Sequence, residues 1–133
     1  MSHRFLLSIV AALSLAACSG GVIPLAQSPA APGAQGTLNI SEGTQGNLEI
    51  KLDVNRLEAA AKVIPGAIVY VVWAAPAGGA PQNLGELTVG DDLKGHLETR
   101  TPLRRFELFV TAEELRTTSR PSGTRVLSAR VNQ

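Results

Sequence analysis

Apolar and polar residues alternate without interruption from residue 47 to residue 54 of this chain. A repeat of two over that length predicts a β-strand with one face buried and the other in water. A shorter run at residues 37–40 precedes it, and the connecting residues 41–45 contain a glycine that favours a turn. The two runs are therefore expected to form a hairpin.

Five further segments have the character of strands. Residues 67–73 are apolar on both faces and rich in β-branched side chains, which is typical of a central strand covered on two sides. The other four strands are expected at residues 83–89, 93–99, 104–111 and 124–131, with turn residues at 90–92 and 120–123. About seven short strands at this spacing predict an all-β fold, an antiparallel β-sandwich.

Only residues 55–63 favour a helix. Asn55 and Glu58 have the spacing of a capping box, and Glu58 and Lys62 are four residues apart, as in a helical ion pair. Pro65 and Gly66 are expected to end any helix that forms there.

The first residues have the pattern of an export signal. One Arg and one His precede a nearly uninterrupted apolar run from residue 5 to residue 15. As a helix, residues 5–17 would be about 20 Å long, too short for a hydrocarbon core of roughly 30 Å. Residues 1–17 are therefore predicted to be a signal peptide and not a permanent membrane span.

The sequence Leu15-Ala16-Ala17-Cys18 resembles the lipobox of bacterial lipoproteins. The resemblance implies cleavage before Cys18 and lipid attachment to its thiol, which would anchor the protein in the membrane. Ser19 follows, where the sorting pattern of many such proteins has Asp for retention at the inner membrane. The expected location is thus the cell envelope, at the outer membrane facing the periplasm. The alternative is an ordinary secretory signal cut after Ala17.

The mature chain divides by composition into two parts. Residues 18–36 are rich in Gly, Pro, Ala, Ser and Gln, and are predicted to be the lipidated cysteine followed by a flexible linker. Residues 37–133 are predicted to be the β-sandwich domain. Removal of Arg4 with the signal peptide leaves 11 of the 12 basic residues and 11 acidic ones, so the net charge of the mature chain is near zero. Nucleic acid is therefore not an expected partner.

Several short motifs resemble those in the extracytoplasmic domain of membrane-bound anti-sigma factors, over residues 46–131. They are Tyr70-Val-Val-Trp73, Asn83-Leu84-Gly85, the segment from Phe106 to Glu113, and Pro121-Ser122-Gly123. The resemblance implies an immunoglobulin-like β-sandwich, in agreement with the strand pattern. The inhibitory activity of that family resides in a cytoplasmic helical segment, so it does not carry over.

The candidate chemical groups form no recognisable catalytic or metal-binding set. His96 is the only histidine after the signal and is expected to be a lone exposed imidazole. Asp91 and Asp92 are expected to form part of a turn. Glu113 and Glu114 are expected to lie at the solvated end of a strand. No cofactor, metal or catalytic residue is predicted, and the protein is not expected to be an enzyme.

A partner-binding patch is predicted from the parity of two strands. Trp73 is expected to point into the sandwich, as the tryptophan of this strand does in immunoglobulin domains. Residues of the opposite parity would then face outward and form an exposed apolar surface. The predicted patch comprises Ile68, Tyr70, Val72, Arg105, Glu107 and Phe109. The alternative is that the linker, residues 55–63 or a loop covers these side chains.

These observations predict a non-catalytic, lipid-anchored envelope protein whose β-sandwich binds an envelope protein or a wall polymer, or has a structural role. The alternatives are an accessory sensor that works with a transmembrane signalling partner, and an enzyme with an unrecognised site.

Overall fold

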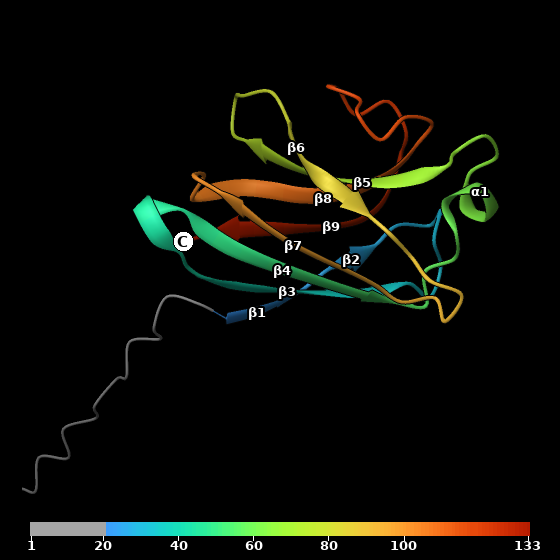
Figure 1. Cartoon of the computed structure of the whole chain (residues 1–133), viewed down its shortest axis with the longest axis horizontal. Coiled ribbons are helices and arrows are strands. Elements are labelled where there is room, and N and C mark those ends of the chain that lie inside the picture. The colour runs from blue at the N-terminus through green and yellow to red at the C-terminus, as the bar shows by residue number, and fades with distance from the viewer. Residues whose placement is uncertain (1–20) are drawn as a thin grey trace, which may run out of the picture.

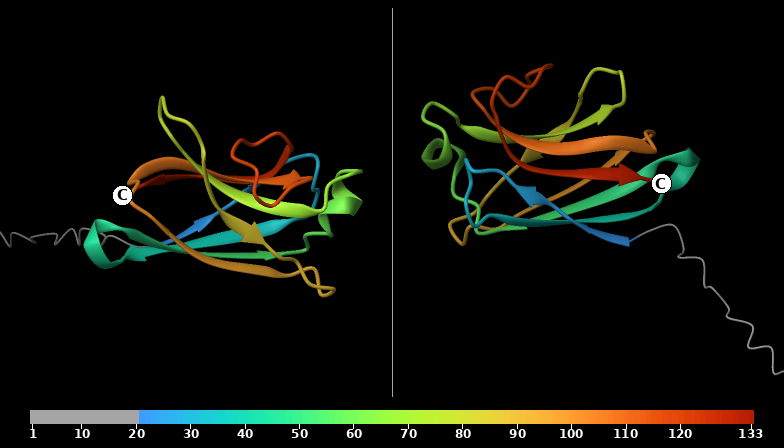
Figure 2. Two further views of the ribbon diagram at one scale, coloured as in Figure 1. Left: turned by 45° about the horizontal axis from the view of Figure 1, so that its top comes forward. Right: turned by 180° about the vertical axis from the view of Figure 1, so that it is seen from behind.

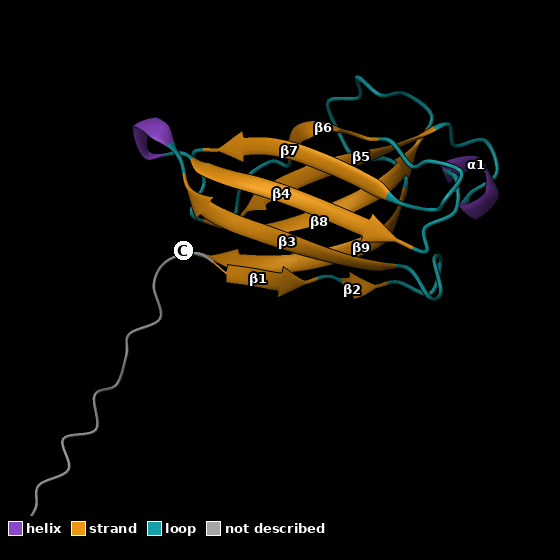
Figure 3. Cartoon of the chain, turned by 60° about the horizontal axis from the view of Figure 1, so that its bottom comes forward, coloured by secondary structure: helices purple, strands orange, loops and turns teal. Residues whose placement is uncertain are grey.

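Two antiparallel sheets pack face to face in the computed structural model, which describes residues 21–133 (Figure 3). Sheet A has the strand order β1-β3-β4-β7, and sheet B has the order β2-β9-β8-β5-β6. The strands are β1 (Gly21–Pro24), β2 (Ala26–Gln27), β3 (Gln35–Glu42), β4 (Leu48–Asn55), β5 (Val69–Pro76), β6 (Gln82–Leu87), β7 (Gly95–Thr101), β8 (Arg105–Glu113) and β9 (Thr124–Asn132). Two short helices complete the fold, the 3₁₀ helix η1 (Thr44–Gly46) and α1 (Ala60–Val63).

The connectivity of the main strands is that of an immunoglobulin-like sandwich. β3, β4 and β7 lie side by side in the order of immunoglobulin strands A, B and E. In sheet B, β9, β8, β5 and β6 follow the order G, F, C and C′. These seven strands correspond to the seven that the sequence predicts, so the all-β sandwich is confirmed.

The main core lies between the two sheets and follows from the alternation in the sequence. The inward side chains of β3 and β4 meet in register, with Leu38 opposite Leu52 and Ile40 opposite Ile50. All four are buried, whereas the polar residues between them face outward. Removing their apolar surface from water drives the two sheets together, at about 25 cal/mol per Å².

The segment predicted to be a flexible linker is part of the fold from residue 21 onward. β1 pairs with β3 in sheet A, and β2 pairs with β9 in sheet B. Between them, Leu25 is buried and its N–H donates to the carbonyl of Gly36 at 2.9 Å. The prediction was wrong here because Pro and Ala can serve in short edge strands, where fewer N–H groups have to be paired. The segment passes from one sheet to the other at one side of the sandwich (Figure 1).

The helix predicted at residues 55–63 is reduced to the single turn α1. Asn55 is the last residue of β4, so no capping box forms, although Lys62 and Glu58 do pair at 3.8 Å. Leu57 and Ala60 are buried, and this packing, more than helix propensity, holds the connection to β5 in place. Among residues 21–133, no helix has the length and apolar character needed to cross a membrane.

The turn predicted at residues 90–92 is confirmed. The Gly90 N–H donates to the Lys94 carbonyl at 2.9 Å, and the Asp92 carboxylate accepts from the Lys94 N–H at 3.1 Å. Asp92 therefore serves the turn, as its sequence context indicates.

Candidate functional surfaces

The six residues predicted to form an exposed patch do not lie on one surface. Tyr70 and Val72 point between the sheets and are 2% and 1% exposed, while Phe109 is buried on the opposite face of sheet B. Ile68 alone among the apolar members is exposed, at 64%. The prediction was wrong because both faces of β5 are apolar, so that its alternation does not decide which face meets sheet A.

Tyr70 shows what fixes the orientation of β5. Its hydroxyl donates to the carbonyl of Glu58 at 2.6 Å and so ties the connection before β5 to the core. Burial, with a smaller contribution from the charge of Glu58, raises the pKa of Tyr70 to about 12. The phenol therefore remains a neutral hydrogen-bond donor throughout the physiological range.

Trp73 lies on the outer face of sheet B, contrary to the prediction that it points inward. It stands directly opposite Phe109 on β8, with the ring centroids 6.5 Å apart and the rings stacked at 20°. Val69 and Val71 complete this second apolar cluster, separate from the main core. The guanidinium of Arg125 lies 3.8 Å from the centre of the Phe109 ring and closes one side of the cluster.

The cover over Trp73 is the connection between β8 and β9, residues 114–123, here termed the strap. It lies on the side of sheet B that faces away from sheet A (Figures 1 and 2). The side-chain amide of Asn83, the strand neighbour of Trp73, donates to the strap carbonyls of Arg116 and Thr118 at 3.4 and 3.0 Å. Arg116 also lies 3.6 Å from the carboxylate of Glu86. Trp73 is thereby fully buried on an outer face of the sandwich.

Glu113 anchors the end of the strap next to β9 and is only 2% exposed. Its carboxylate accepts hydrogen bonds from the Thr111 hydroxyl, the Ser122 hydroxyl at 2.8 Å, and the N–H groups of Ser122 and Gly123. The Thr111 oxygen in turn accepts from the Trp73 indole N–H at 2.9 Å. Desolvation acts to raise the pKa of Glu113, but these hydrogen bonds together outweigh it and hold the pKa below its ordinary value.

The buried position of Glu113 corrects the prediction that the Glu113-Glu114 pair is a solvated strand end, which fits Glu114 alone. The donors at Ser122 and Gly123 come from nine and ten residues further along the chain. No local pattern in the sequence connects them to a glutamate. Sequence reasoning found the Pro121-Ser122-Gly123 turn but not its acceptor.

The outer face of sheet A is open and wholly polar on its three long strands. The side chains of this polar face are Gln35, Thr37, Asn39 and Ser41 on β3, Glu49, Lys51, Asp53 and Asn55 on β4, and His96, Glu98 and Arg100 on β7. Hydroxyl and amide groups occupy β3, and opposite charges oppose each other across β4 and β7. Lys51 and Glu98, for example, are 3.9 Å apart.

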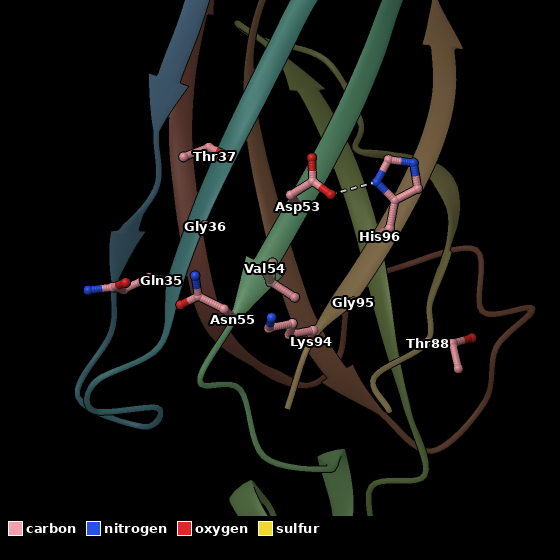
Figure 4. A pocket seen from close by; sticks show the side chains of 10 residues that line it. All are labelled: Gln35, Gly36, Thr37, Asp53, Val54, Asn55, Thr88, Lys94, Gly95 and His96. Atoms are coloured by element: carbon pink, nitrogen blue, oxygen red, sulfur yellow. Dashed lines mark hydrogen bonds and ion pairs between the residues drawn. The ribbon is translucent and has the colours of Figure 1, made fainter. Parts of the chain in front are cut away.

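A groove of about 490 Å³ lies at one end of the polar face, where Thr37, Asp53 and His96 are neighbours across three strands (Figure 4). Asn55 and Lys94 line it further along. The groove therefore presents hydroxyl, amide, carboxylate, imidazole and ammonium groups together. Such a set can both donate and accept hydrogen bonds to a polar ligand.

His96 has two carboxylate partners and is not the isolated imidazole that the sequence predicts. Its Nδ1 lies 2.7 Å from Asp53, and its Nε2 lies 3.3 Å from Glu98. The hydrogen bond with Asp53, followed by that with Glu98, raises the pKa of His96 above its ordinary value. The two carboxylates contact opposite sides of the ring, and among residues 21–133 no His, Cys, Asp and Glu side chains converge on a point that could hold a metal ion.

Arg105 and Glu107, the charged members of the predicted patch, line a second hollow of about 480 Å³ at one end of sheet B. Pro76 and Arg130 are among the other lining residues. Glu107 is also paired with Arg125 at 2.5 Å. These two residues thus share a surface with each other, but not with Tyr70, Val72 or Ile68.

The predicted lipidation site, Cys18, and the signal peptide lie outside the described residues. No protein-family model matches this chain, and no curated protein matches it either. The lipobox and the likeness to the extracytoplasmic domain of anti-sigma factors therefore stay predictions that rest on the sequence motifs.

Proposed function

We propose that this protein is a non-catalytic, lipid-anchored component of the bacterial cell envelope, and that its sandwich binds a cell-wall glycan through the polar face. The observation that carries the proposal is the contrast between the two sheets. The outer face of sheet B is covered by the strap, whereas the polar face is open and carries a groove at its end.

The chemistry of the polar face favours a glycan over a protein ligand. The centres of protein interfaces are enriched in Tyr, Trp, Phe and Met, and none of these occurs on this face. Its residues offer hydroxyl, amide and carboxylate groups on neighbouring strands about 4.8 Å apart, and sugar hydroxyls need such a dense array of partners. Val22 on β1 is the one large apolar side chain that stands exposed at its margin.

The proposed anchor places this face near the membrane. β1 begins at Gly21, so only two residues separate it from Cys18. At most about 3.6 Å per residue, the chain from Cys18 to Gly21 spans roughly 11 Å. A lipid on Cys18 would therefore hold the sandwich against the membrane surface, and its ligand would have to come within reach of that surface.

Replacing Thr37, Asp53 and His96 by alanine should weaken binding to purified peptidoglycan at least about tenfold, because three neighbouring polar partners are lost at roughly 0.5–1.5 kcal/mol each. Co-sedimentation of the protein with peptidoglycan measures this. The matched control replaces Lys62, Glu114 and Arg120, which are also exposed but lie away from the polar face. Absence of binding by the unaltered protein, or equal binding by both triple variants, would refute the glycan proposal. Capture of a protein through the same three residues would instead support a protein ligand.

Cys18→Ser should move the protein from the membrane to the soluble fraction and abolish labelling by a radioactive fatty acid, because only the thiol accepts the lipid. Fractionation of cells that express the full chain measures both. Ser19→Ala serves as the control, since it alters the neighbouring residue but keeps the thiol. Unchanged fractionation of Cys18→Ser would establish the ordinary secretory signal and leave the glycan proposal to be judged by its own assay.

A further inference from the structure

The strap is attached to the sandwich by polar contacts and buries little of its own surface. Leu115 is 65% exposed, and most strap residues are open to solvent. The attachments are the Asn83 amide, the Arg116–Glu86 ion pair and the carboxylate of Glu113. A segment with few buried apolar contacts opens at a lower free energy than the core does.

Beneath the strap lies the apolar cluster of Trp73 and Phe109, in which Arg125 of β9 also covers the Phe109 ring. Trp73 and Phe109 are 0% and 1% exposed although they stand on an outer sheet face. If the strap left, Arg125 would still lie over the Phe109 ring, but the Trp73 indole would be uncovered along the edge marked by Asn83. The strap therefore determines whether sheet B exposes the Trp73 indole.

Unlike the Arg116–Glu86 ion pair, the Glu113 carboxylate has no cationic partner among residues 21–133. Two arginines, one on β9 and one on the strap, are paired with other carboxylates. Glu114 follows Glu113 in the chain, Arg125 on β9 pairs with Glu107, and Arg116 on the strap pairs with Glu86. Val69, its partner on β5, is apolar. The negative charge is thus stabilised only by neutral donors, and two of these, Ser122 and Gly123, belong to the strap.

We propose that the strap is an acid-releasable cover: protonation of the Glu113 carboxylate weakens its bonds to Ser122 and Gly123, the strap lifts, and the Trp73 indole is exposed. A proton on the carboxylate replaces an acceptor by a donor and removes the charge that strengthens these bonds. The inference is independent of the proposed glycan binding, which concerns the opposite sheet.

The direction of the pH dependence follows from the depressed pKa of Glu113. The unfolded or released carboxylate has the ordinary pKa, about 4.3, and the attached one a lower value. Attachment is therefore fully stabilised above the ordinary value and is lost as the pH falls through the depressed one. Release of the strap in the unaltered protein is therefore expected only at a pH below the ordinary pKa of a glutamate.

Trp73 is the only tryptophan in the chain and so reports directly on the strap. In the full chain at pH 7, Glu113→Gln should shift Trp73 emission to longer wavelength and increase its quenching by acrylamide. Amide hydrogen exchange at Ser122 and Gly123 should rise at least about tenfold, while the circular dichroism of the strands is retained. Glu114→Gln, the exposed neighbour, should change none of these signals.

The unaltered protein should show the same Trp73 changes on acidification before its strand signal is lost. Ser122→Ala removes one hydroxyl donor and leaves the carboxylate in place, so the acid transition should move to higher pH. The proposal is overturned if Trp73 stays shielded in folded Glu113→Gln. It is equally overturned if Trp73 exposure coincides with loss of the strand signal in the unaltered protein, or if Ser122→Ala leaves the transition unmoved.

Discussion

Gly123→Ala should destabilise the sandwich by about 3 kcal/mol, one of the largest effects expected of a single methyl group. A Cβ atom at residue 123 would lie 1.7 Å from the carbonyl oxygen of Ala112 and 2.8 Å from its carbon. Both are backbone atoms of β8, so neither can rotate away. The variant has to separate the start of β9 from β8 or abandon the bonds to Glu113. Urea denaturation followed by circular dichroism measures the loss.

Gly21→Ala is the matched control, since nothing lies within 4 Å of a Cβ atom at that residue. It should change the free energy of unfolding by no more than about 0.5 kcal/mol. A Gly123→Ala protein as stable as the control would mean that the close approach of residue 123 to β8 does not exist. Trp73 fluorescence would show in the same samples whether the strap or the whole sheet is disturbed.

The number of the long strands and their positions along the chain are predictable from the sequence, because each has an alternating or wholly apolar pattern bounded by turn residues. Residues 47–54 show this most clearly, with the buried and exposed residues of β4 alternating as predicted. The turn at residues 90–92 is local in the same way, since its bonds join residues at most four apart. Short-range patterns suffice wherever short-range contacts decide the structure.

The orientation of β5 is different, because its two faces are equally apolar. Tyr70 and Trp73 were correctly placed on opposite faces, but which of them meets sheet A is decided by distant residues. The Tyr70 hydroxyl finds an acceptor at Glu58, and the Trp73 indole finds one at Thr111. The strap then supplies the cover that makes an outward tryptophan possible. None of these contacts can be inferred from the pattern of β5 alone.

The polar face was likewise predictable only in part. Alternation places Asp53 and His96 on the solvated faces of their strands, as found. Their contact depends on the pairing of β4 with β7, which joins residues 43 positions apart in the chain. Opposite charges across that pair stabilise the register, since like charges directly opposite each other would repel. No local pattern indicates this pairing, because it depends on the order of the strands in sheet A.

The composition of residues 18–36 predicts a flexible linker, but the segment is packed from residue 21 onward. Leu25→Ala tests this packing. Leu25 packs against Gly36 closely enough that a Cβ atom at Gly36 would lie 2.4 Å from its side chain. Removing three buried carbon atoms of Leu25 should lower the free energy of unfolding by about 2–3 kcal/mol. A flexible linker would predict no change at all. Thermal and urea unfolding of the purified chain distinguish the two.

Val22→Ala provides the comparison within the same segment, because Val22 is 64% exposed and three residues away. It should cost no more than about 0.5 kcal/mol. Equal, negligible effects of both substitutions would restore the flexible linker and lengthen the reach of an anchor at Cys18. A loss confined to Leu25→Ala would show that the fold begins within a few residues of Cys18. Lipidation would then fix the sandwich at the membrane surface by covalent geometry alone, and would leave the polar face able to reach only a ligand that lies close to that surface.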